Sequence, residues 1–232
     1  MCGRYSVTLP PEALRQLFRY RNRPNLRARY NVAPTQSAPV VRHREAASAD
    51  ERELAELRWG LVPNWAKSVG DGPLLINARL ETVAEKPAFR SAFRSRRCLV
   101  PADGFYEWKR EDKAKQPFRI HPKDGSPVGF AGLWEHWQGT DGEAIESFAI
   151  LTTEAEGAIR EIHDRMPVML DPSAFDAWLD PALSDPDLIR SAIKQIPVSS
   201  LAADPVSTYV NAVRNDDVHC FDPPEPVQQT LF

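Results

Sequence analysis

The sequence has no long hydrophobic run, few cysteines and few histidines. The 232 residues include no run of about 18 apolar residues, so we expect no transmembrane helix and no membrane partner. The three cysteines are widely spaced and odd in number, which argues against a disulfide scaffold and favours a cytoplasmic protein. The five histidines are scattered and no CxxC or HExxH spacing occurs, so we expect neither a metal site nor a cofactor.

The chain also lacks a strong excess of charge. It carries 29 Lys and Arg residues against 32 Asp and Glu residues, which argues against a protein that coats nucleic acid without specificity. Basic residues nevertheless gather at positions 15–29 and 86–97, and such local faces can bind phosphate groups on a mildly acidic body. The alternative is that both stretches are solvated helix faces without a ligand.

Turn signals and short apolar segments predict one α+β domain rich in antiparallel strands. Helical spacing occurs at 11–20, at 81–97 with a break near Pro87, and later at 173–180 and 185–194. Strand-like segments lie at 37–43, 54–62, 97–110, 117–122, 127–137 and 146–153, with Asp-Gly pairs between or beside several of them. We therefore expect a domain over residues 1–220 and a proline-rich tail at 221–232.

Cys2 directly follows Met1. Methionine aminopeptidases remove an initiator methionine when the second residue is small, which would leave Cys2 with a free α-amine and a thiol on adjacent carbons. Because an α-amine titrates near ~7.7–8.0 and a thiol near ~8.5, part of the amine is nucleophilic at neutral pH. The amine can attack an aldehyde to give an imine, and the thiol can then close a five-membered thiazolidine ring. An interior cysteine lacks this chemistry, because its nitrogen belongs to a peptide bond.

Other interpretations of Cys2 remain open at this point. The cysteine can be an accidental small residue. Alternatively, its free amine can act as a base for its thiol in an N-terminal nucleophile hydrolase, and glutamine amidotransferases of that type also begin with Met-Cys-Gly. That class needs an oxyanion hole, often built with an Asn-Gly pair, and this sequence contains no Asn-Gly dipeptide.

Three further stretches place polar side chains beside apolar segments. Asn77 and Arg79 end an apolar run, where an amide and a guanidinium can bind a ligand at a cleft. Glu107 alternates with aromatic residues in a strand-like segment, so partial desolvation can raise its pKa toward the range useful for proton transfer. His163 and Arg165 precede an apolar strand, and histidine is the side chain best matched to proton shuttling at neutral pH. The alternatives are a capped loop, an exposed strand edge and a structural histidine.

Two residues in proline- and tryptophan-containing stretches are candidates for contacts with bases. Pro34 lies in "RYNVAPTQ" and Trp65 in "RWGLVPNWAK", and a proline or an aromatic ring can wedge against or stack on a base. Core packing is the ordinary alternative for both.

Together these stretches resemble the SOS-response-associated peptidase family, also called the SRAP domain. The matching pieces are Met-Cys-Gly-Arg at the start, "YNVAP", "WGLVP", "INAR-E", "RCLVPADGFYEW" and "HDRMP", in the order of the family over roughly residues 1–170. The resemblance implies a bifurcated, mostly antiparallel sheet that forms a pseudo-barrel with flanking helices. It also implies a sensor of abasic sites in single-stranded DNA, acting as a monomer, which forms a covalent thiazolidine with the ring-opened sugar.

The resemblance further implies a role for each candidate residue. Cys2 would supply both nucleophiles, Asn77 would hold the sugar or the amine, Glu107 would move protons, and His163 would assist opening of the sugar ring. Arg4, Arg79 and Arg165 would contact phosphates, and Pro34 and Trp65 would shape the end of the strand channel. The peptidase role in the family name would be removal of Met1, although a host aminopeptidase could do the same. A non-catalytic DNA-binding module is a further alternative.

The last residues suggest a separate partner. Gln228, Leu231 and Phe232 have the Q-x-x-L-F spacing of short peptides that dock on the bacterial sliding clamp. The preceding prolines would keep such a peptide extended, and two apolar anchors with a glutamine suit a groove. Because the pattern is short, chance is the alternative.

Overall fold

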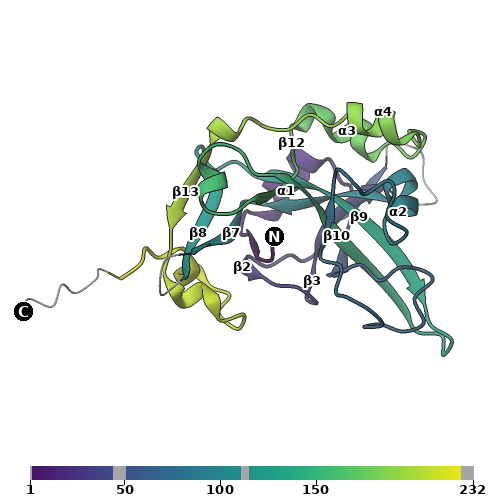
Figure 1. Ribbon diagram of the computed structural model, residues 1–232, viewed down its shortest axis with the longest axis horizontal. Helices are drawn as coiled ribbons and strands as arrows, with labels where there is room; N and C mark the ends of the chain where they lie inside the picture. Colours follow the sequence, from purple (N-terminus) through teal and green to yellow (C-terminus); the bar gives the residue numbers. More distant parts are fainter. Residues whose placement is uncertain (1, 44–50, 111–114, 226–232) are drawn as a thin grey trace, which may run out of the picture.

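The computed structural model describes residues 2–43, 51–110 and 115–225, and its strands form two sheets (Figure 1). The smaller sheet is antiparallel, with the strand order β13-β8-β7-β1-β2. Its strands are β1 (Tyr5–Val7), β2 (Arg29–Val32), β7 (Gly104–Arg110), β8 (Lys115–Pro122) and β13 (Leu201–Pro205). Strand β1 lies between β2 and β7, so the residues that follow Cys2 are interior to this sheet.

The larger sheet closes on itself. Its members are β3 (Ser37–His43), β4 (Arg52–Trp59), β5 (Asn77–Arg79), β6 (Arg97–Ala102), β9 (Val128–Gln138), β10 (Ala144–Glu154), β11 (Arg165–Pro167) and β12 (Met169–Leu170). Pairing runs β10-β4-β3-β6-β9, and β9 pairs back to β10, which completes a five-stranded barrel. Only the β4–β10 and β5–β10 pairs are parallel among the described strands. The predicted α+β fold, with a mostly antiparallel sheet that forms a pseudo-barrel, is confirmed.

One continuous segment, residues 97–110, runs from the larger sheet into the smaller one. The sequence pattern is strand-like over this segment and has an Asp-Gly turn signal at 103–104, and the structure divides it into β6 and β7 at Asp103. The Asp103 carboxylate accepts hydrogen bonds from Ser6 Oγ and from the backbone N–H and hydroxyl of Thr8, the last at 2.6 Å. Asp103 therefore ties β1 to the point where the chain leaves the barrel.

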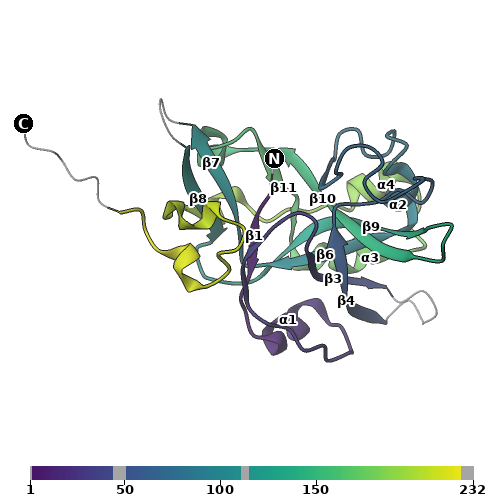
Figure 2. The same ribbon diagram turned by 90° about the horizontal axis from the view of Figure 1, so that it is seen from below.

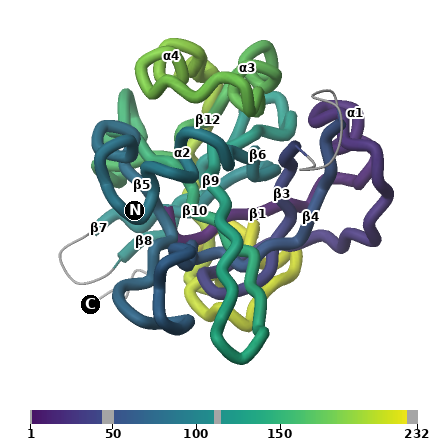
Figure 3. The backbone as a smooth tube through the Cα atoms, turned by 90° about the vertical axis from the view of Figure 1, so that its right-hand side faces the viewer, coloured from purple at the N-terminus to yellow at the C-terminus, as the bar shows by residue number. Residues whose placement is uncertain are grey.

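Within the described ranges, four short helices flank the sheets. They are α1 (Pro11–Phe18), α2 (Arg90–Ser95), α3 (Phe175–Leu179) and α4 (Pro186–Ser191). Figure 3 shows α3 and α4 together on the side of the molecule that also carries β12. Short 3-10 turns follow at η1 (Gly157–Glu161), η2 (Pro172–Ala174), η3 (Val198–Ser200), η4 (Thr208–Asn211) and η5 (Val218–Phe221).

The helices are shorter than the sequence pattern predicted, for local reasons. Helix α1 buries Leu14 and Phe18 and stops there because Arg19 adopts a left-handed conformation, with φ of 56°. The predicted helix at 81–97 is mostly turns, and only Arg90–Ser95 is helical. Pro87 has no backbone N–H to donate, so a regular helix cannot run through it.

Strand β1 packs onto the barrel through its first residue. The Tyr5 ring is fully buried and makes edge contacts with Trp59 and Phe130, with ring centroids 5.2 and 6.0 Å away. Both partners belong to barrel strands, so burial of these rings holds the N-terminal strand against the barrel.

Arg97 has a structural role that its position in a basic stretch did not reveal. The side chain is buried, and its guanidinium donates to the backbone carbonyls of Phe93, Arg94, Trp178, Asp180 and Leu183. These carbonyls lie at or just beyond the C-terminal ends of α2 and α3, where helix carbonyls lack internal partners. Burial lowers the pKa of Arg97 to about 10. Arg97 therefore does not belong to a phosphate-binding face.

Several arginines of the first basic stretch are also paired within the chain. Arg15 pairs with Glu12, Arg19 with Asp176, Arg21 with Glu51 and Arg29 with Asp216. Cys2, Cys98 and Cys220 are buried free thiols, which agrees with the expectation that no disulfide scaffold is present. In the part of the chain that the structure describes, no helix has the length and apolar character needed to cross a membrane.

Candidate active site

The start of the chain lies beside Glu107. Strands β1 and β7 pair with Tyr5 opposite Phe105 and Ser6 opposite Gly104, and the backbone N–H of Tyr106 donates to the Arg4 carbonyl at 2.9 Å. The antiparallel pairing therefore carries the residues before Arg4 past Glu107. Figure 2 shows the N-terminus near β11 in that view, and Figure 3 shows it near β5. These two strands pair with the same end of β10.

Cys2 is completely buried, and its Sγ lies 3.9 Å from the Arg4 carbonyl oxygen. Burial raises the pKa of the Cys2 thiol well above its usual value, and the negative charge of Glu107 adds to the effect. Both causes disfavour a thiolate. The sulfur of Cys2 is therefore held in its protonated form, close to a carboxyl group.

Glu107 is removed from water, as the strand alternation predicted. Its side chain is 4% exposed. Burial raises the pKa of the Glu107 carboxyl to about 7, and the charge of Asp164 contributes to the rise. A carboxyl group with a pKa near neutrality can both accept and donate a proton at cellular pH.

His163 is the nearest histidine to this carboxyl. Its Nδ1 lies 3.9 Å from Glu107 Oε1 and 3.0 Å from Asp164 Oδ1, and it accepts the backbone N–H of Arg165 at 3.0 Å. Burial lowers the pKa of His163, so the neutral imidazole dominates at pH 7. The same Nδ1 also lies 3.3 Å from the Arg165 carbonyl oxygen, so it has both a donor and an acceptor within hydrogen-bond distance.

Asn77 presents an amide group that has no hydrogen-bond partner within the described part of the chain. It begins β5, which runs parallel to β10 with Asn77 opposite Ile150. Its Nδ2 and Oδ1 atoms are both buried, and neither has a hydrogen-bond partner among the described residues. Buried amides in folded proteins are almost always satisfied, so this one is a candidate for binding a ligand.

Arg165 joins the two strands on either side of β10. Its guanidinium forms a bidentate pair with Glu81, with both N···O distances 2.9 Å, and donates to the Thr152 carbonyl at 2.7 Å. Glu81 follows β5 closely, while Arg165 begins β11 directly after His163 and Asp164. This pair therefore holds the Asn77 strand and the His163 turn at the same end of β10.

The three arginines expected to contact phosphates differ in how many hydrogen bonds and ion pairs their side chains make within the described chain. Arg79 is exposed and its side chain makes no hydrogen bond to any residue that the structure describes. Arg165 is occupied by Glu81. Arg4 donates to Asn31 Oδ1 and to the carbonyls of Val210 and Asn211.

The two candidates for base contacts lie at the surface to different degrees. Trp65 is 65% exposed on the loop between β4 and β5, so it does not pack in the core. The base of this loop is held by the Leu61–Leu75 bridge and by the Trp137 indole, which donates to the Ala66 carbonyl at 2.7 Å. Pro34 is half-buried in the turn after β2.

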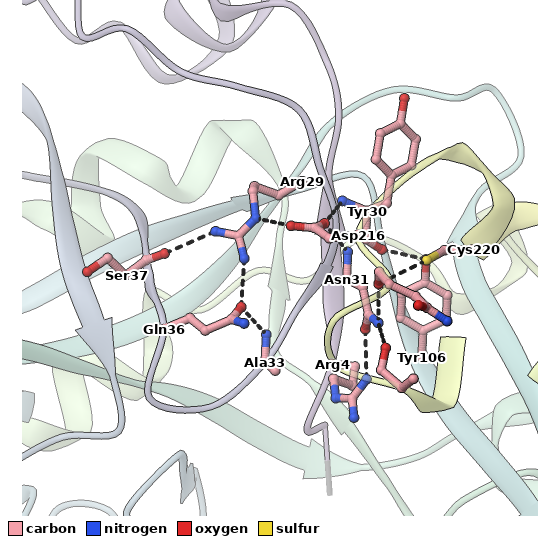
Figure 4. Close-up of polar contacts among 12 residues, drawn as sticks. Arg4, Arg29, Tyr30, Asn31, Ala33, Gln36, Ser37, Tyr106, Asp216 and Cys220 are labelled. Carbon is pink, nitrogen blue, oxygen red and sulfur yellow. Dashed lines mark hydrogen bonds and ion pairs between the residues drawn. The ribbon is translucent and has the colours of Figure 1, made fainter. Parts of the chain in front are cut away.

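A second polar cluster, which no sequence pattern indicates, lies next to Arg4 (Figure 4). It is built on Asn31 of β2 and Asp216 near the C-terminal end of the described chain. Asn31 stands in the "YNVAP" stretch, but no local pattern links it to a residue 185 positions away. No group of three or more metal-ligating side chains occurs among the residues described. Gln228, Leu231 and Phe232 lie outside them.

Comparison with known proteins identifies relatives over nearly the whole chain. Residues 1–213 match the model of the SOS response associated peptidase (SRAP) family. The abasic site processing protein YoqW of Bacillus subtilis is 38% identical over 220 residues, covering 93% of this chain and 96% of that protein. The abasic site processing protein HMCES of Gallus gallus is 34% identical over 266 residues, covering 97% of this chain and 78% of that protein. A crystal structure of a protein from Bacteroides thetaiotaomicron superposes with a TM-score of 0.83 at 26% identity, covering 96% of this chain and 99% of that one.

Proposed function

The chain belongs to the SOS response associated peptidase family, and from this premise we propose that it captures abasic sites in single-stranded DNA as a covalent adduct of Cys2. The observation that carries the proposal is the burial of Cys2 beside Glu107, a carboxyl group whose pKa is about 7. An aminothiol needs such a neighbour, because each step of its reaction with an aldehyde moves a proton.

The reactive species begins at Cys2. While Met1 is present, the nitrogen of Cys2 is an amide and cannot attack a carbonyl group. Removal of Met1, by the protein itself or by an aminopeptidase, frees this nitrogen. Glu107 then stabilises the ammonium form of the amine and accepts a proton from it when the neutral amine is needed.

The reaction balances as a condensation that releases one water. An abasic sugar is mostly a closed hemiacetal, and ring opening moves a proton from the C1′ hydroxyl to the ring oxygen while the C1′–O4′ bond breaks. The Cys2 nitrogen adds to the aldehyde carbon, and loss of water gives an imine. The thiol then adds its sulfur to the same carbon and its proton to the nitrogen, which closes the thiazolidine ring.

The neighbouring side chains suit these steps. The neutral His163 ring lies within reach of Glu107 and can relay the proton that ring opening requires. Glu107 donates the proton that leaves with the water. The unpartnered amide of Asn77 can bind the sugar hydroxyls or the amine. Because the Cys2 thiol is held protonated, we expect the amine to react before the sulfur.

We assign the contacts with DNA to candidate side chains that are exposed at the surface. Of the three expected phosphate ligands, Arg79 is the one whose guanidinium makes no hydrogen bond to a described residue, so we assign it the principal contact. Trp65 is exposed and can stack on a base at the end of the strand. A single strand can bend an abasic sugar into a buried site, whereas a duplex keeps it between stacked neighbours.

The test is a denaturing gel after incubation of the processed protein with an oligonucleotide that contains one abasic site. We expect a slower band that resists detergent. It should be absent with Cys2→Ala, absent when any residue precedes Cys2, and present with Cys220→Ala, which removes a buried thiol elsewhere. An adduct that survives in Cys2→Ala would refute the assignment of the nucleophile.

A further inference from the structure

Strand β2 contains a bulge next to the strand that follows Cys2. Tyr5 pairs with Val32 and Val7 with Arg29, so β2 has one residue more than β1 between these two pairs. The extra residue leaves the N–H groups of Tyr30 and Asn31 without a strand partner, because β2 is at the edge of the sheet. Both N–H groups donate to Asp216 Oδ1, at 2.6 and 2.9 Å.

Asp216 fixes this bulge from the far end of the chain. Its second oxygen accepts from Arg29 Nε at 2.5 Å, and the side chain is only 20% exposed. One carboxylate therefore satisfies three donors of β2, two from the backbone and one from a guanidinium. Charge-assisted bonds of this kind are among the stronger hydrogen bonds in proteins.

Asn31 connects the bulge to Arg4 (Figure 4). The residue is completely buried, and its Oδ1 accepts from Arg4 Nη1 at 2.9 Å. Its Nδ2 donates to the carbonyls of Val210, Ala212 and Asn215 at 3.1, 3.2 and 2.8 Å. Arg4 donates to the Val210 carbonyl as well, at 2.9 Å. Arg4, Asn31 and Asp216 form what we call the latch.

The segment that binds the latch also contacts residues next to the two groups that the proposed reaction must align. Arg4 is two residues after Cys2. Trp108 directly follows Glu107, and its indole N–H donates to Asn211 Oδ1 at 2.7 Å. The segment that binds Asn31 therefore contacts the neighbours of both Cys2 and Glu107.

We propose that Asn31 and Asp216 are positioning residues for the capture reaction, an inference that rests on the proposed function. They hold Arg4, and through it the backbone of Cys2, so that the amine meets the Glu107 carboxyl and the sugar carbon in a reactive geometry. Neither residue touches DNA. Asp216 lies beyond the residues matched by the family model, so the anchor of the latch is outside that match.

Loss of the latch should slow chemistry without weakening DNA binding. A displacement of about 1 Å at reacting groups can cost roughly 100-fold in rate. We expect Asn31→Ala and Asp216→Ala to lower the single-turnover rate at saturating abasic oligonucleotide roughly 10- to 100-fold. The half-saturating DNA concentration should not change. Affinity for an oligonucleotide with a tetrahydrofuran analogue, which has no aldehyde, should also stay at the wild-type value.

Two further measurements separate positioning from general destabilisation. The limb of the pH–rate profile that reports Glu107 should move in both variants, because the distance between the carboxyl and the amine changes. Tyr209→Phe is the matched control, since it removes the hydrogen bond to Asp217 in the same segment but leaves the latch intact. It should keep the wild-type rate. Asp216→Asn retains an oxygen acceptor and should recover part of the rate lost in Asp216→Ala.

The possible outcomes are distinguishable. If Asn31→Ala unfolds at the assay temperature, Asp216→Asn carries the test, with an intermediate rate and unchanged binding of the analogue expected. A latch variant that reacts at the wild-type rate, or loses rate and analogue binding in parallel, overturns the inference while the proposed function stands. A wild-type protein that forms no adduct overturns the proposed function and this inference with it.

Discussion

Replacing Glu107 by glutamine should make the protein more stable at neutral pH and inactive. The carboxyl group has an ordinary pKa of 4.5 when exposed and about 7 in the folded chain. Because the folded state binds its proton more tightly, the stability that this group contributes is fully present below pH 4.5. It is lost as the pH rises to 7.

The difference between these two pKa values corresponds to roughly 3 kcal/mol of unfolding free energy. Glutamine stays neutral at every pH and is nearly the same shape. Glu107→Gln should therefore match the wild type near pH 4 and exceed it by roughly 3 kcal/mol at pH 8. For a chain of this size that difference is worth roughly 6–12 °C in Tm.

Urea unfolding of both proteins at several pH values between 4 and 8 measures the effect. The difference between the two curves isolates Glu107 from the other titrating groups, and Glu156→Gln reports removal of an exposed carboxylate. A difference that stays constant from pH 4 to pH 8 would refute a raised pKa at Glu107. In the same preparations, Glu107→Gln should lose rapid adduct formation, because glutamine cannot exchange a proton with the amine.

Four other changes test separate parts of the structure. Asn77→Ala should abolish rapid adduct formation. It should change the unfolding free energy by less than about 1 kcal/mol, because no described residue bonds to its amide. A large loss of stability in thermal unfolding would contradict this small change. Arg97→Met should cost at least roughly 3 kcal/mol, measured by urea unfolding, because five carbonyls, two of them in fully buried hydrogen bonds, lose their donor. Arg79→Ala should weaken DNA binding and reduce the slope of log affinity against log salt by about 1, whereas an unchanged slope argues against a phosphate contact. Deleting residues 228–232 should abolish pull-down of a bacterial sliding clamp without changing adduct formation, and surviving pull-down rules out the tail motif.

The elements that local pattern controls could be predicted from sequence. Strand-like segments such as 117–122 and 127–137 correspond closely to β8 and β9, and the alternation around Glu107 correctly indicated a desolvated carboxyl group. The motifs were sufficient to identify the family, and the pseudo-barrel was predicted from the known fold of that family. Periodicity alone could not have shown that β9 and β10 close the barrel.

What escaped prediction depends on contacts between distant residues. Arg97 is one of several arginines in its stretch, and only the folded chain shows that it binds helix-end carbonyls instead of solvent. Asn31 and Asp216 meet across 185 residues, and neither has a local signal. The side chain of Arg4 has the charge expected of a phosphate ligand, but its hydrogen bonds to the C-terminal segment are visible only in three dimensions.

The burial of Cys2 has a consequence for the order of events during synthesis. Strand β7, which pairs with the residues that follow Cys2, lies about a hundred residues further along the chain. At roughly 5–20 residues per second, about 5–20 s of synthesis separate the two. During that interval Cys2 has not yet met Glu107 and is open to a processing enzyme at the ribosome. The completed fold then buries a thiol that was exposed during synthesis.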